Sequence, residues 1–506
     1  EVKNIASRPL TVAVPEFVQK AKTDPAKGVD GAYIIQAEIY GNGTYVIEPG
    51  KSITFGAAFQ AYREKNEKAI TPDVKAEYAK RMAYVKNSID GSLVLETPEK
   101  VIDTEFRFAK IRASESICKT KGGYMHAPGG ESYYAAIWAN DQAEYVNPFF
   151  PFTGYEVGNA SALNSYRHFA RFMNDEWKPI PSSIIAEGES IWNGAGDRGD
   201  GAMIAYGAAR YALTRADKAE AEELWPLIEW CIEYSRRQIN DKGVVKSDRD
   251  ELEGRFPAGD ANLCTSTLYY DALISAAHLG RELGKSPKLI ADYQKRAKAM
   301  RAAIESHFGA TVQGYETYRY YEGNDILRSW ICMPLCVGIY DRADATMDAL
   351  FKSDLYTKDG LLTAQGSETF WDRSTLYAFR GGYAAGYADF ITEQLSYYSN
   401  RRLLGDHVPY PIEAWPEGSQ RHRSAESGLY CRIITEGMFG IRPTGMRSFE
   451  LKPEIPSSWE FASLKSVRAF GSNFDIDVKR LSGDKLRVYV VEMGGKKQSF
   501  TIKQGK

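Results

Sequence analysis

The sequence has no long hydrophobic run and little net charge, and each of these features excludes a class of protein. No apolar stretch approaches the roughly 18–20 residues that a membrane-spanning helix needs, so no membrane span is expected. The net charge is −2 over 506 residues, of which 26% are charged, and this balance argues against a nucleic-acid-binding surface. We therefore expect neither a bilayer nor nucleic acid as a partner.

Histidine and cysteine are also scarce. The six cysteines and six histidines are scattered along the chain. Cys332 and Cys336 have the i, i+4 spacing of a helix inside an apolar run, but no Cys-x-x-Cys pair or Cys/His cluster suggests a metal site. The cysteines are best explained as small buried apolar residues. We expect no metal and no cofactor.

A chain of 506 residues is too long for one ordinary core, so several domains are expected. Residues 1–63 contain runs of β-branched and aromatic residues between turn signals, which predicts the remnant of a β-sandwich. Residues 64–99 are charged and predict a linker helix. Residues 446–506 return to strand patterns, with turns at Ser482-Gly483-Asp484 and Gly494-Gly495, and predict a small C-terminal β domain.

Residues 100–445 have a helical pattern, with apolar residues at i, i+3 and i+4 between short breaks. Neighbouring helices joined by short turns pair as antiparallel hairpins, and a series of hairpins that closes on itself forms an (α/α)6 barrel. The expected fold is therefore mainly α, with this catalytic barrel flanked by the two β regions. The predicted helices are Ala160–Met173, Gly201–Thr214, Lys218–Gln238, Asn262–Leu283, Pro287–His307, Asp325–Tyr340, Ala343–Leu350, Gly381–Asn400 and Ser424–Glu436.

Four loop clusters between these helices mix acids with Trp, Tyr, Arg or Gly. Glycoside hydrolysis needs one protonated carboxyl group to donate to the leaving oxygen and one carboxylate to activate water. Further acids and arginines hold sugar hydroxyls, and aromatic rings cover the apolar sugar face. Because alternate loops of a helical barrel gather at one end, the four clusters predict a glycoside hydrolase site. They are Tyr133–Tyr145, Trp192–Ala202, Ser247–Asn262 and Tyr410–Gln420.

This layout resembles the inverting six-hairpin glycosidases, which are the glucoamylases, trehalases and glycogen-debranching amylo-α-1,6-glucosidases. Trp138-Ala139-Asn140-Asp141 is similar to their first-hairpin Trp-x-x-Asp motif, although Asn140 stands where glucoamylases carry an Arg. The segment from Trp192 to Asp200-Gly201-Ala202 is similar to a glucoamylase segment that ends in Asp-Gly-x-Ala. The resemblance implies an oligosaccharide or glycoside substrate. The implied substrate-binding residues are Trp138, Asp141, Trp192, Arg198, Asp200, Trp371, Arg373 and Trp415.

The third cluster stands where these enzymes keep their general acid. Ser247-Asp248-Arg249-Asp250, followed by Arg255-Phe256, is similar to the trehalase Ser-x-x-Asp arrangement and implies Asp250 as the acid. Glu251 and Glu253 are rivals, because the glucoamylase acid is a Glu. The α-L-rhamnosidases, on the same toroid, place a Glu ahead of a Gly-Asp pair. Matching that pair to Gly259-Asp260 favours Glu253.

The fourth cluster implies the catalytic base. Glu413, followed by Trp415 and Gly418, resembles the glucoamylase base, which lies in a Glu-x-aromatic segment before the final helix. Glu417 and Glu426 are rivals, and Glu426 also suits the first turn of a helix, where the helix dipole favours a carboxylate.

Structural roles remain open for some of these residues. Asp141 also suits a helix N-terminus, and Asp197-Arg198-Asp200 also suits a salt-bridged turn. Trp371-Asp372-Arg373 lines the cleft or caps a helix, and Tyr124 and His126 are candidates for the rim of the pocket.

The expected activity is inverting, exo-acting hydrolysis of α-glycosidic, and more specifically α-glucosidic, oligosaccharides. The alternatives are an α-glycoside phosphorylase, an α-L-rhamnosidase-like enzyme and a non-catalytic carbohydrate-binding protein. Because the chain begins at Glu1 rather than Met, we expect a removed signal or N-terminal piece and a periplasmic or extracellular location. The sequence does not indicate the oligomeric state.

Overall fold

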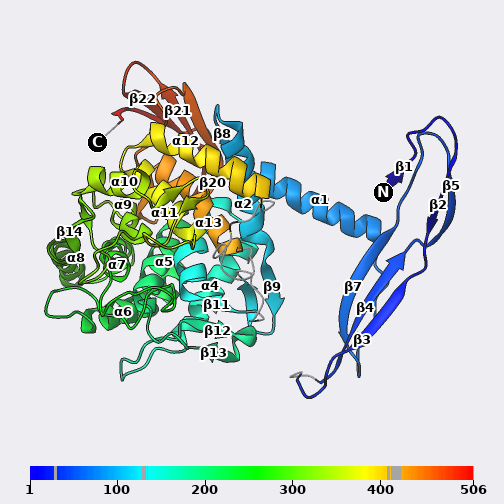
Figure 1. Cartoon of the computed structure of the whole chain (residues 1–506), viewed down its shortest axis with the longest axis horizontal. Coiled ribbons are helices and arrows are strands. Elements are labelled where there is room, and N and C mark those ends of the chain that lie inside the picture. The colour runs from blue at the N-terminus through cyan, green and yellow to red at the C-terminus, as the bar shows by residue number, and fades with distance from the viewer. Residues whose placement is uncertain (28–30, 128–132, 134, 407–410, 412–422, 505–506) are drawn as a thin grey trace. The chain divides into compact units, whose positions relative to one another are not determined.

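The computed structural model describes the chain except residues 28–30, 128–132, 134, 407–410, 412–422 and 505–506 (Figure 1). It divides into two compact units, Glu1–Asn87 and Ser88–Lys506. Among the described residues, no helix is both long and apolar enough to cross a membrane.

The first unit consists of small antiparallel sheets. Val14 and Ile47 are the buried apolar side chains among its described residues, whereas Phe59 is 82% exposed. The strands predicted within residues 1–63 are present. The sheets pair β1 with β6, β2 with β5, and the central strand β4 with β3 and β7. The strands are β1 (Val2–Lys3), β2 (Leu10–Val14), β3 (Val18–Lys22), β4 (Tyr33–Tyr40), β5 (Gly43–Ile47), β6 (Ser52–Ile53) and β7 (Gly56–Arg63).

Helix α1 (Val74–Asp90) crosses the boundary between the two units and has no buried residue. It occupies the middle of the segment predicted as a linker helix. A helix that is polar on all sides is stabilised by its own side-chain pairs and not by a core.

In the described part of the second unit, helical segments contact one another in a closed ring. Short helix η1 contacts α5, α5 contacts α7, and α7 contacts η3 and α9. These last two contact α11, α11 contacts α13, and α13 returns to η1. The ring segments are η1 (Ala139–Val146), α5 (Asp200–Arg215), α7 (Leu263–Glu282), η3 (Ser329–Cys332), α9 (Met333–Cys336), α11 (Asp372–Ala384) and α13 (Ser424–Arg432).

A second layer of helices packs outside this ring. Most of these helices pack on a ring segment near them in the chain, whereas α2 packs on the last ring segment, α13. Thus α6 packs on α5, α8 on α7, and α2 on α13. Likewise α4 packs on η1, α10 on η3, and α12 on α11. These helices are α2 (Lys100–Glu115), α4 (Glu156–Ala170), α6 (Lys218–Arg237), α8 (Pro287–Phe308), α10 (Ala343–Phe351) and α12 (Ala388–Tyr398). The remaining short helices are α3 (Phe150–Thr153), η2 (Ala186–Gly188), η4 (Ser399–Asp406) and η5 (Ile433–Met438).

The ring helices are buried on nearly all sides, which explains their composition. All but the last residue of α5 are buried, and its sequence is rich in alanine and glycine. A Cβ atom added to Gly207 would lie 1.5 Å from the carbonyl oxygen of Ala143 in η1. The contact between α5 and η1 therefore requires glycine at this position.

Most predicted helices are confirmed within a few residues, but two predictions are wrong. The helix expected over Asp325–Tyr340 is reduced to η3 and α9, because Pro334 interrupts the run and Gly338 adopts a positive φ of 87°. The single helix expected over Gly381–Asn400 is instead α11 and α12, separated by a turn at Gly386, whose φ is 90°. In addition, α11 begins at Asp372, before the predicted start.

The C-terminal region forms a five-stranded antiparallel sheet in the order β23-β22-β21-β20-β8. Its edge strand β8 comes from far upstream and pairs Leu95 with Leu464 of β20 (Figure 1). Phe470 follows β20 and donates its N–H to the carbonyl oxygen of Thr214 in α5. The sheet therefore covers the C-terminal end of α5. Its strands are β8 (Val94–Glu96), β20 (Phe461–Ala469), β21 (Ser472–Arg480), β22 (Lys485–Glu492) and β23 (Lys497–Lys503).

Short strands stiffen the loops between the helices. They are β9 (Ile117–Thr120), β10 (Gly123–His126), β11 (Ile137–Trp138), β12 (Ser183–Ile185), β13 (Ser190–Trp192), β14 (Gly309–Val312), β15 (Tyr315–Tyr318), β16 (Tyr356–Thr357), β17 (Gly360–Leu361), β18 (Ile441–Gly445) and β19 (Ser448–Leu451).

Candidate functional site

The N-terminal ends of the ring helices bring acids together around one arginine. Arg373 is the second residue of α11, and its guanidinium lies 2.6 Å from Glu426 in the first turn of α13. The same guanidinium lies 3.4 Å from Asp141 in the first turn of η1. Residues from the first loop cluster and from the helix that follows the fourth therefore meet at Arg373.

The third loop cluster reaches the same arginine through Glu251. Its carboxylate lies 3.7 Å from Arg373, and its side chain is fully buried. Burial, followed by the nearby charges of Glu144 and Asp141, holds the pKa of Glu251 well above its ordinary value. We use the name acid cluster for Asp141, Glu144, Asp200, Asp250, Glu251, Glu253 and Glu426.

Two further members of the acid cluster titrate near neutrality. Burial raises the pKa of Glu144 to about 7, although the Tyr377 hydroxyl donates to its carboxylate and Arg432 lies nearby. Burial also raises the pKa of Glu426 to about 7 against the opposing charge of Arg373. The acid cluster can therefore hold protons at a pH where ordinary carboxyl groups have lost them.

Asp250, the predicted acid, is enclosed by hydrogen bonds. Its Oδ2 accepts from the Tyr320 hydroxyl at 2.9 Å, and its Oδ1 accepts from the Leu252 N–H at 2.9 Å. Arg328 lies 3.8 Å away. Burial raises the pKa of Asp250, and the charge of Arg328 opposes that rise. These contacts fix the turn that follows Asp250.

Glu253, a rival for the same role, lies at the end of that turn and is more accessible. Its side chain is 22% exposed, whereas those of Asp250 and Glu251 are 1% and 0% exposed. Its backbone has a φ of 60°, an uncommon conformation for a residue other than glycine. Such strained positions cluster at functional sites. Its Oε1 lies 3.4 Å from Nη1 of Arg198.

Arg198 and Asp200, both predicted to bind substrate, pair with each other. The Arg198 guanidinium donates to Asp200 at 2.9 Å and to the Ser182 carbonyl oxygen at 3.3 Å, and both side chains are buried. This salt-bridged turn is the structural role that the sequence left open. Arg198 also contacts the Glu253 carboxylate, so the same turn helps to hold Glu253 in place.

Three aromatic rings gather beside Arg198. Trp138 and Trp192 lie on strands that flank β12, with ring centroids 5.3 Å apart, and Tyr133 lies 5.8 Å from Trp138. Tyr133 is 42% exposed, and Arg198 lies 5.8 Å from the Trp138 ring. A partly exposed aromatic group beside acids is suited to the apolar face of a sugar.

Other predicted site residues lie differently. Trp371 is buried, and the guanidinium groups of Arg255 and Arg373 lie 5.2 and 4.9 Å from the centre of its ring. Glu413, Trp415 and Glu417 lie outside the described residues.

His126, one of two candidates for the rim of the pocket, lies in the interior instead. Its ring is fully buried between the Gln142 amide, 3.0 Å from Nδ1, and the Ser424 hydroxyl, 3.1 Å from Nε2. Burial lowers the pKa of His126 to about 4, so the ring stays neutral. His126 therefore ties η1 to α13 at the positions next to Asp141 and two before Glu426. Tyr124 is partly exposed on the same strand.

Several residues of this site were not singled out from the sequence. Glu144 could have been found, because it lies one helical turn after Asp141. Tyr320 and Arg328 could not, because they contact Asp250 from positions far away in the chain. Among the described residues, no group of three or more His, Cys, Asp or Glu side chains has the arrangement of a metal site.

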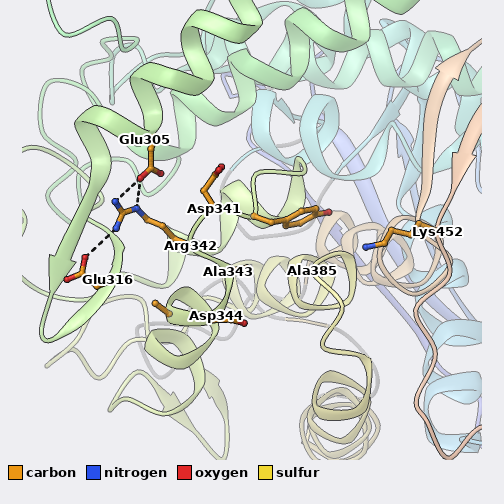
Figure 2. Close-up of a pocket in the computed structure, with 10 residues that line it drawn as sticks. Glu305, Glu316, Asp341, Arg342, Ala343, Asp344, Ala385 and Lys452 are labelled. Atoms are coloured by element: carbon orange, nitrogen blue, oxygen red, sulfur yellow. Dashed lines mark hydrogen bonds and ion pairs between the residues drawn. The ribbon is translucent and has the colours of Figure 1, made fainter. Parts of the chain in front are cut away.

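A pocket of about 560 Å³ lies away from this site (Figure 2). Several of its residues follow the C-terminal ends of α9 and α11, including Tyr340 and Ala385. Arg342 pairs there with Glu305 at 2.7 Å and with Glu316 at 3.7 Å, as Figure 2 shows. Helix α11 has 13 residues, so its two ends are about 20 Å apart. This Arg342 pocket is thus separate from the acid cluster.

Comparison with known proteins finds likeness in structure alone. Neither a known protein family nor a curated protein matches the sequence. A GH78 family rhamnosidase of Bacillus sp. GL1 matches with a TM-score of 0.60 and 11% identity, over 96% of this chain and 54% of that chain. A sialidase matches with a TM-score of 0.59 and 14% identity, over 91% and 52%. A bacterial glucoamylase complexed with acarbose matches with a TM-score of 0.58 and 12% identity, over 83% and 72%.

These identities are low enough that the likeness concerns the fold. The chain spans about half the length of the sialidase and of the rhamnosidase, at 52% and 54%. A mainly helical chain with small sheets is similar to a rhamnosidase and to a glucoamylase over most of its length. The predicted resemblance to the six-hairpin glycosidases is therefore confirmed at the level of the fold.

Proposed function

We propose that this protein is a glycoside hydrolase that cleaves α-glycosides with inversion, in an exo-acting manner, on an (α/α)6 barrel. The observation that carries the proposal is the accessible Glu253, held beside Arg198 and a partly exposed aromatic group at the N-terminal ends of the ring helices. The closed ring of contacts with an outer layer of helices supports the barrel.

We propose Glu253 rather than Asp250 as the general acid. An acid must reach the glycosidic oxygen, and Glu253 is the more exposed of the two. Glu253 donates its proton as the bond from the anomeric carbon to the leaving oxygen breaks, and Arg198 then stabilises the carboxylate that remains. Asp250 acts as a positioning residue, because its hydrogen bonds to Leu252 and Tyr320 hold the turn that presents Glu253.

Glu413 is the proposed base. It takes a proton from a water molecule, whose oxygen attacks the anomeric carbon from the face opposite the leaving group. The products are a sugar of inverted configuration and the free alcohol. This mechanism requires the two carboxyl groups to lie roughly 6.5–9.5 Å apart.

Asp141, Arg373 and the Trp138 ring are proposed to hold the sugar in the cleavage subsite. Asp141 and Arg373 offer a charged acceptor and charged donors for hydroxyl groups, and their mutual contact at 3.4 Å is loose enough to be exchanged for contacts to a ligand. Glu426, which pairs with Arg373 at 2.6 Å, is proposed to hold that guanidinium in place, while Glu413 acts as the base.

Two sugars fit this proposal. An α-glucoside follows from the glucoamylase-like motifs, and an α-L-rhamnoside follows from the position of Glu253 ahead of Gly259-Asp260. The likeness to a rhamnosidase and to a glucoamylase supports both to a similar degree. We also propose a periplasmic or extracellular location.

A substrate screen with proton NMR of the first-formed anomer tests the proposal. The panel contains 4-nitrophenyl α-glucoside, 4-nitrophenyl α-L-rhamnoside, trehalose, maltose, isomaltose, kojibiose and nigerose. We expect turnover of at least one member with an inverted first product. A retained anomer would contradict the mechanism, activity that depends on added phosphate would indicate a phosphorylase, and sugar binding without turnover would indicate a binding protein.

A further inference from the structure

A second pocket adjoins the loop that carries Glu253. It has a volume of about 490 Å³ and is lined by Trp177, Asp197, Tyr234, Lys246, Asp248 and Arg249, among others. Asp248 and Arg249 belong to the loop cluster that carries Asp250 and Glu253, and Lys246 directly precedes that cluster. We call it the Trp177 pocket.

Two contacts connect the Trp177 pocket to the proposed acid. Asp197 lines the pocket, and the next residue, Arg198, contacts Glu253 at 3.4 Å. Arg249 also lines the pocket, and its side chain lies against Gly254, since a Cβ atom added there would be 2.9 Å from its Nε. The pocket lining is therefore connected to Glu253 through Arg198, which follows Asp197 in the chain, and through Gly254, which follows Glu253.

The wall of the Trp177 pocket is rigid. The Trp177 and Trp230 rings stack with centroids 5.4 Å apart, and Trp230 stacks on Tyr234 at the same distance. Arg237 lies 4.3 Å from the Trp177 ring. The backbone of Trp177 has a φ of 57°, which an L residue rarely adopts without a local constraint. An aromatic wall fixed in this way costs little entropy when a ligand binds.

The polar groups of the pocket are held in place as well. Asp197 is 6% exposed and accepts from the Tyr234 hydroxyl at 2.5 Å and from the Gly199 N–H at 2.8 Å. Asp248 accepts from the Asp197 N–H at 3.0 Å, so the two acids are linked through the backbone. Lys246 and Arg249 are exposed and supply donors.

This combination of groups matches a neutral sugar. Hydroxyl groups both donate and accept, so they pair with the carboxylates and with the cations, while the stacked rings meet an apolar face. Acids and bases of the lining nearly balance, which does not favour a strongly charged ligand. The volume lies within the range of 300–1,000 Å³ that is usual for small-ligand sites.

We propose that the Trp177 pocket binds the leaving-group side of the substrate, and that this leaving group is a neutral carbohydrate. The inference rests on the proposed function, because it takes Glu253 as the acid that protonates the bond between the two parts of the substrate. It makes the enzyme's substrate a disaccharide unit or longer, with recognition on both sides of the cleaved bond.

The test compares a sugar leaving group with a small aromatic one. Maltotriose is compared with 4-nitrophenyl α-glucoside, and rutinose is compared with 4-nitrophenyl α-L-rhamnoside. The measurements use whichever pair the wild-type protein hydrolyses. For Trp177→Ala we expect kcat/KM on the oligosaccharide to fall about tenfold, which corresponds to about 1.4 kcal/mol, and to fall far less on the aryl glycoside. Lys246→Ala, at an exposed position, should give a smaller fall in the same direction.

Tyr340→Ala in the Arg342 pocket is the matched control and should leave both values unchanged. The inference would be overturned if Trp177→Ala lowered kcat/KM equally on the oligosaccharide and on the aryl glycoside, and if Lys246→Ala changed neither value. Failure of the proposed function is a different result, namely no turnover of any glycoside by the wild-type chain. In that case calorimetric titration of wild type and Lys246→Ala with maltotriose and rutinose decides, and unchanged or undetectable binding overturns the inference.

Discussion

The two ends of the ring helices both bury charged residues, but with opposite charge balance. At the N-terminal ends lies the acid cluster. From the middle of the ring helices towards their C-terminal ends, Arg210 pairs with Asp271 at 2.7 Å, and Arg432 pairs with Glu436 at 2.5 Å. We use the name ion-pair network for Arg210, Asp271, Arg380, Arg432, Glu436 and Arg442.

The charge balance reverses the direction of the pKa shifts. Burial alone would raise the pKa of Glu436, but Arg432, Arg380 and Arg210 together lower it to about 2. Burial raises the pKa of Glu426 to about 7, because Arg373 is shared with other acids. Although both are buried, the Glu436 carboxylate therefore stays charged within its ion pairs, whereas the Glu426 carboxyl group gains and loses a proton near neutral pH. The direction of the shift therefore distinguishes the two ends, and carboxyl groups with raised pKa values are typical of functional sites.

The largest expected effect comes from removing the proposed acid. Glu253→Gln keeps the shape of the side chain and its contact with Arg198 but cannot donate the proton. We expect kcat/KM on the best substrate to fall about 10³-fold, as is typical for loss of a general acid. The free energy of unfolding should change by less than about 1 kcal/mol, because the side chain is partly exposed.

Asp250→Asn serves as the comparison for this prediction. Its single amide oxygen still accepts from the Leu252 N–H, and its NH2 group can donate to the Tyr320 hydroxyl in place of accepting from it, so a smaller loss of activity is expected if Asp250 only positions the turn. An aryl glycoside with a good leaving group needs little proton donation. Recovery on that substrate by Glu253→Gln but not by Asp250→Asn identifies Glu253, and the reverse pattern would return the role to Asp250.

The next effect concerns the ion-pair network. Glu436→Gln leaves Arg210, Arg380 and Arg432 buried without their shared carboxylate. We expect the free energy of unfolding to fall by about 3 kcal/mol in urea titration, the cost of breaking a buried pair. Glu316→Gln, at a side chain 69% exposed in its pair with Arg342, is the control and should cost less than about 0.5 kcal/mol. Equal effects of the two variants would contradict the structural role of the network.

Arg373→Lys keeps the positive charge but removes the guanidinium group shared by three acids. Lysine cannot contact Asp141, Glu251 and Glu426 at once in the planar geometry of a guanidinium. We expect kcat/KM to fall about 10²-fold, mainly because KM rises. The reason is that contacts between Arg373 and the bound sugar are lost in the ground state and the transition state alike. Steady-state kinetics on the aryl glycoside measure it. A fall in kcat with unchanged KM would show that Arg373 acts in the transition state instead.

The sequence was sufficient where turn or capping residues mark the helix ends, and insufficient where an apolar run contains its own helix breakers. Helices α5, α7 and α8 begin and end within one residue of their predicted bounds, and the side chains of Asn262 and Ser286 cap α7 and α8. The run around Trp330–Tyr340 is apolar on all sides, so its pattern does not distinguish a helix from short turns. There Pro334 and the positive φ of Gly338, and not the apolar pattern, determine where the helix ends.

For the site, the sequence located the acids but not their orientation. The convergence of Asp141, Glu251 and Arg373 follows from a barrel that gathers its loops, so it could be predicted. The choice between Asp250 and Glu253 depends on a turn held by Tyr320, 70 residues away from Asp250. No spacing within the loop contains that contact.

The smallest effect concerns how the free energy of unfolding depends on pH. The acid cluster changes this free energy above pH 4.5, and the ion-pair network changes it below pH 4.5. Glu144 and Glu426 have pKa values of about 7 in the fold and 4.5 ordinarily, so between these values the folded chain binds more protons than the unfolded chain. The free energy of unfolding therefore falls as the pH rises from 4.5 to 7. Glu436, with a pKa of about 2, has the opposite effect, and stability falls as the pH drops from 4.5 towards 2.

We thus expect maximal stability near pH 4.5, with each limb changing by on the order of 1 kcal/mol or more. Urea titrations across pH 2.5–8 measure the two limbs. Glu426→Gln should flatten the limb above the maximum and Glu436→Gln the limb below it, because each variant removes one titrating group. If Glu426→Gln flattened the lower limb instead, Glu426 would be a charged partner of Arg373 at all pH values, and the two ends of the helices would not differ in kind.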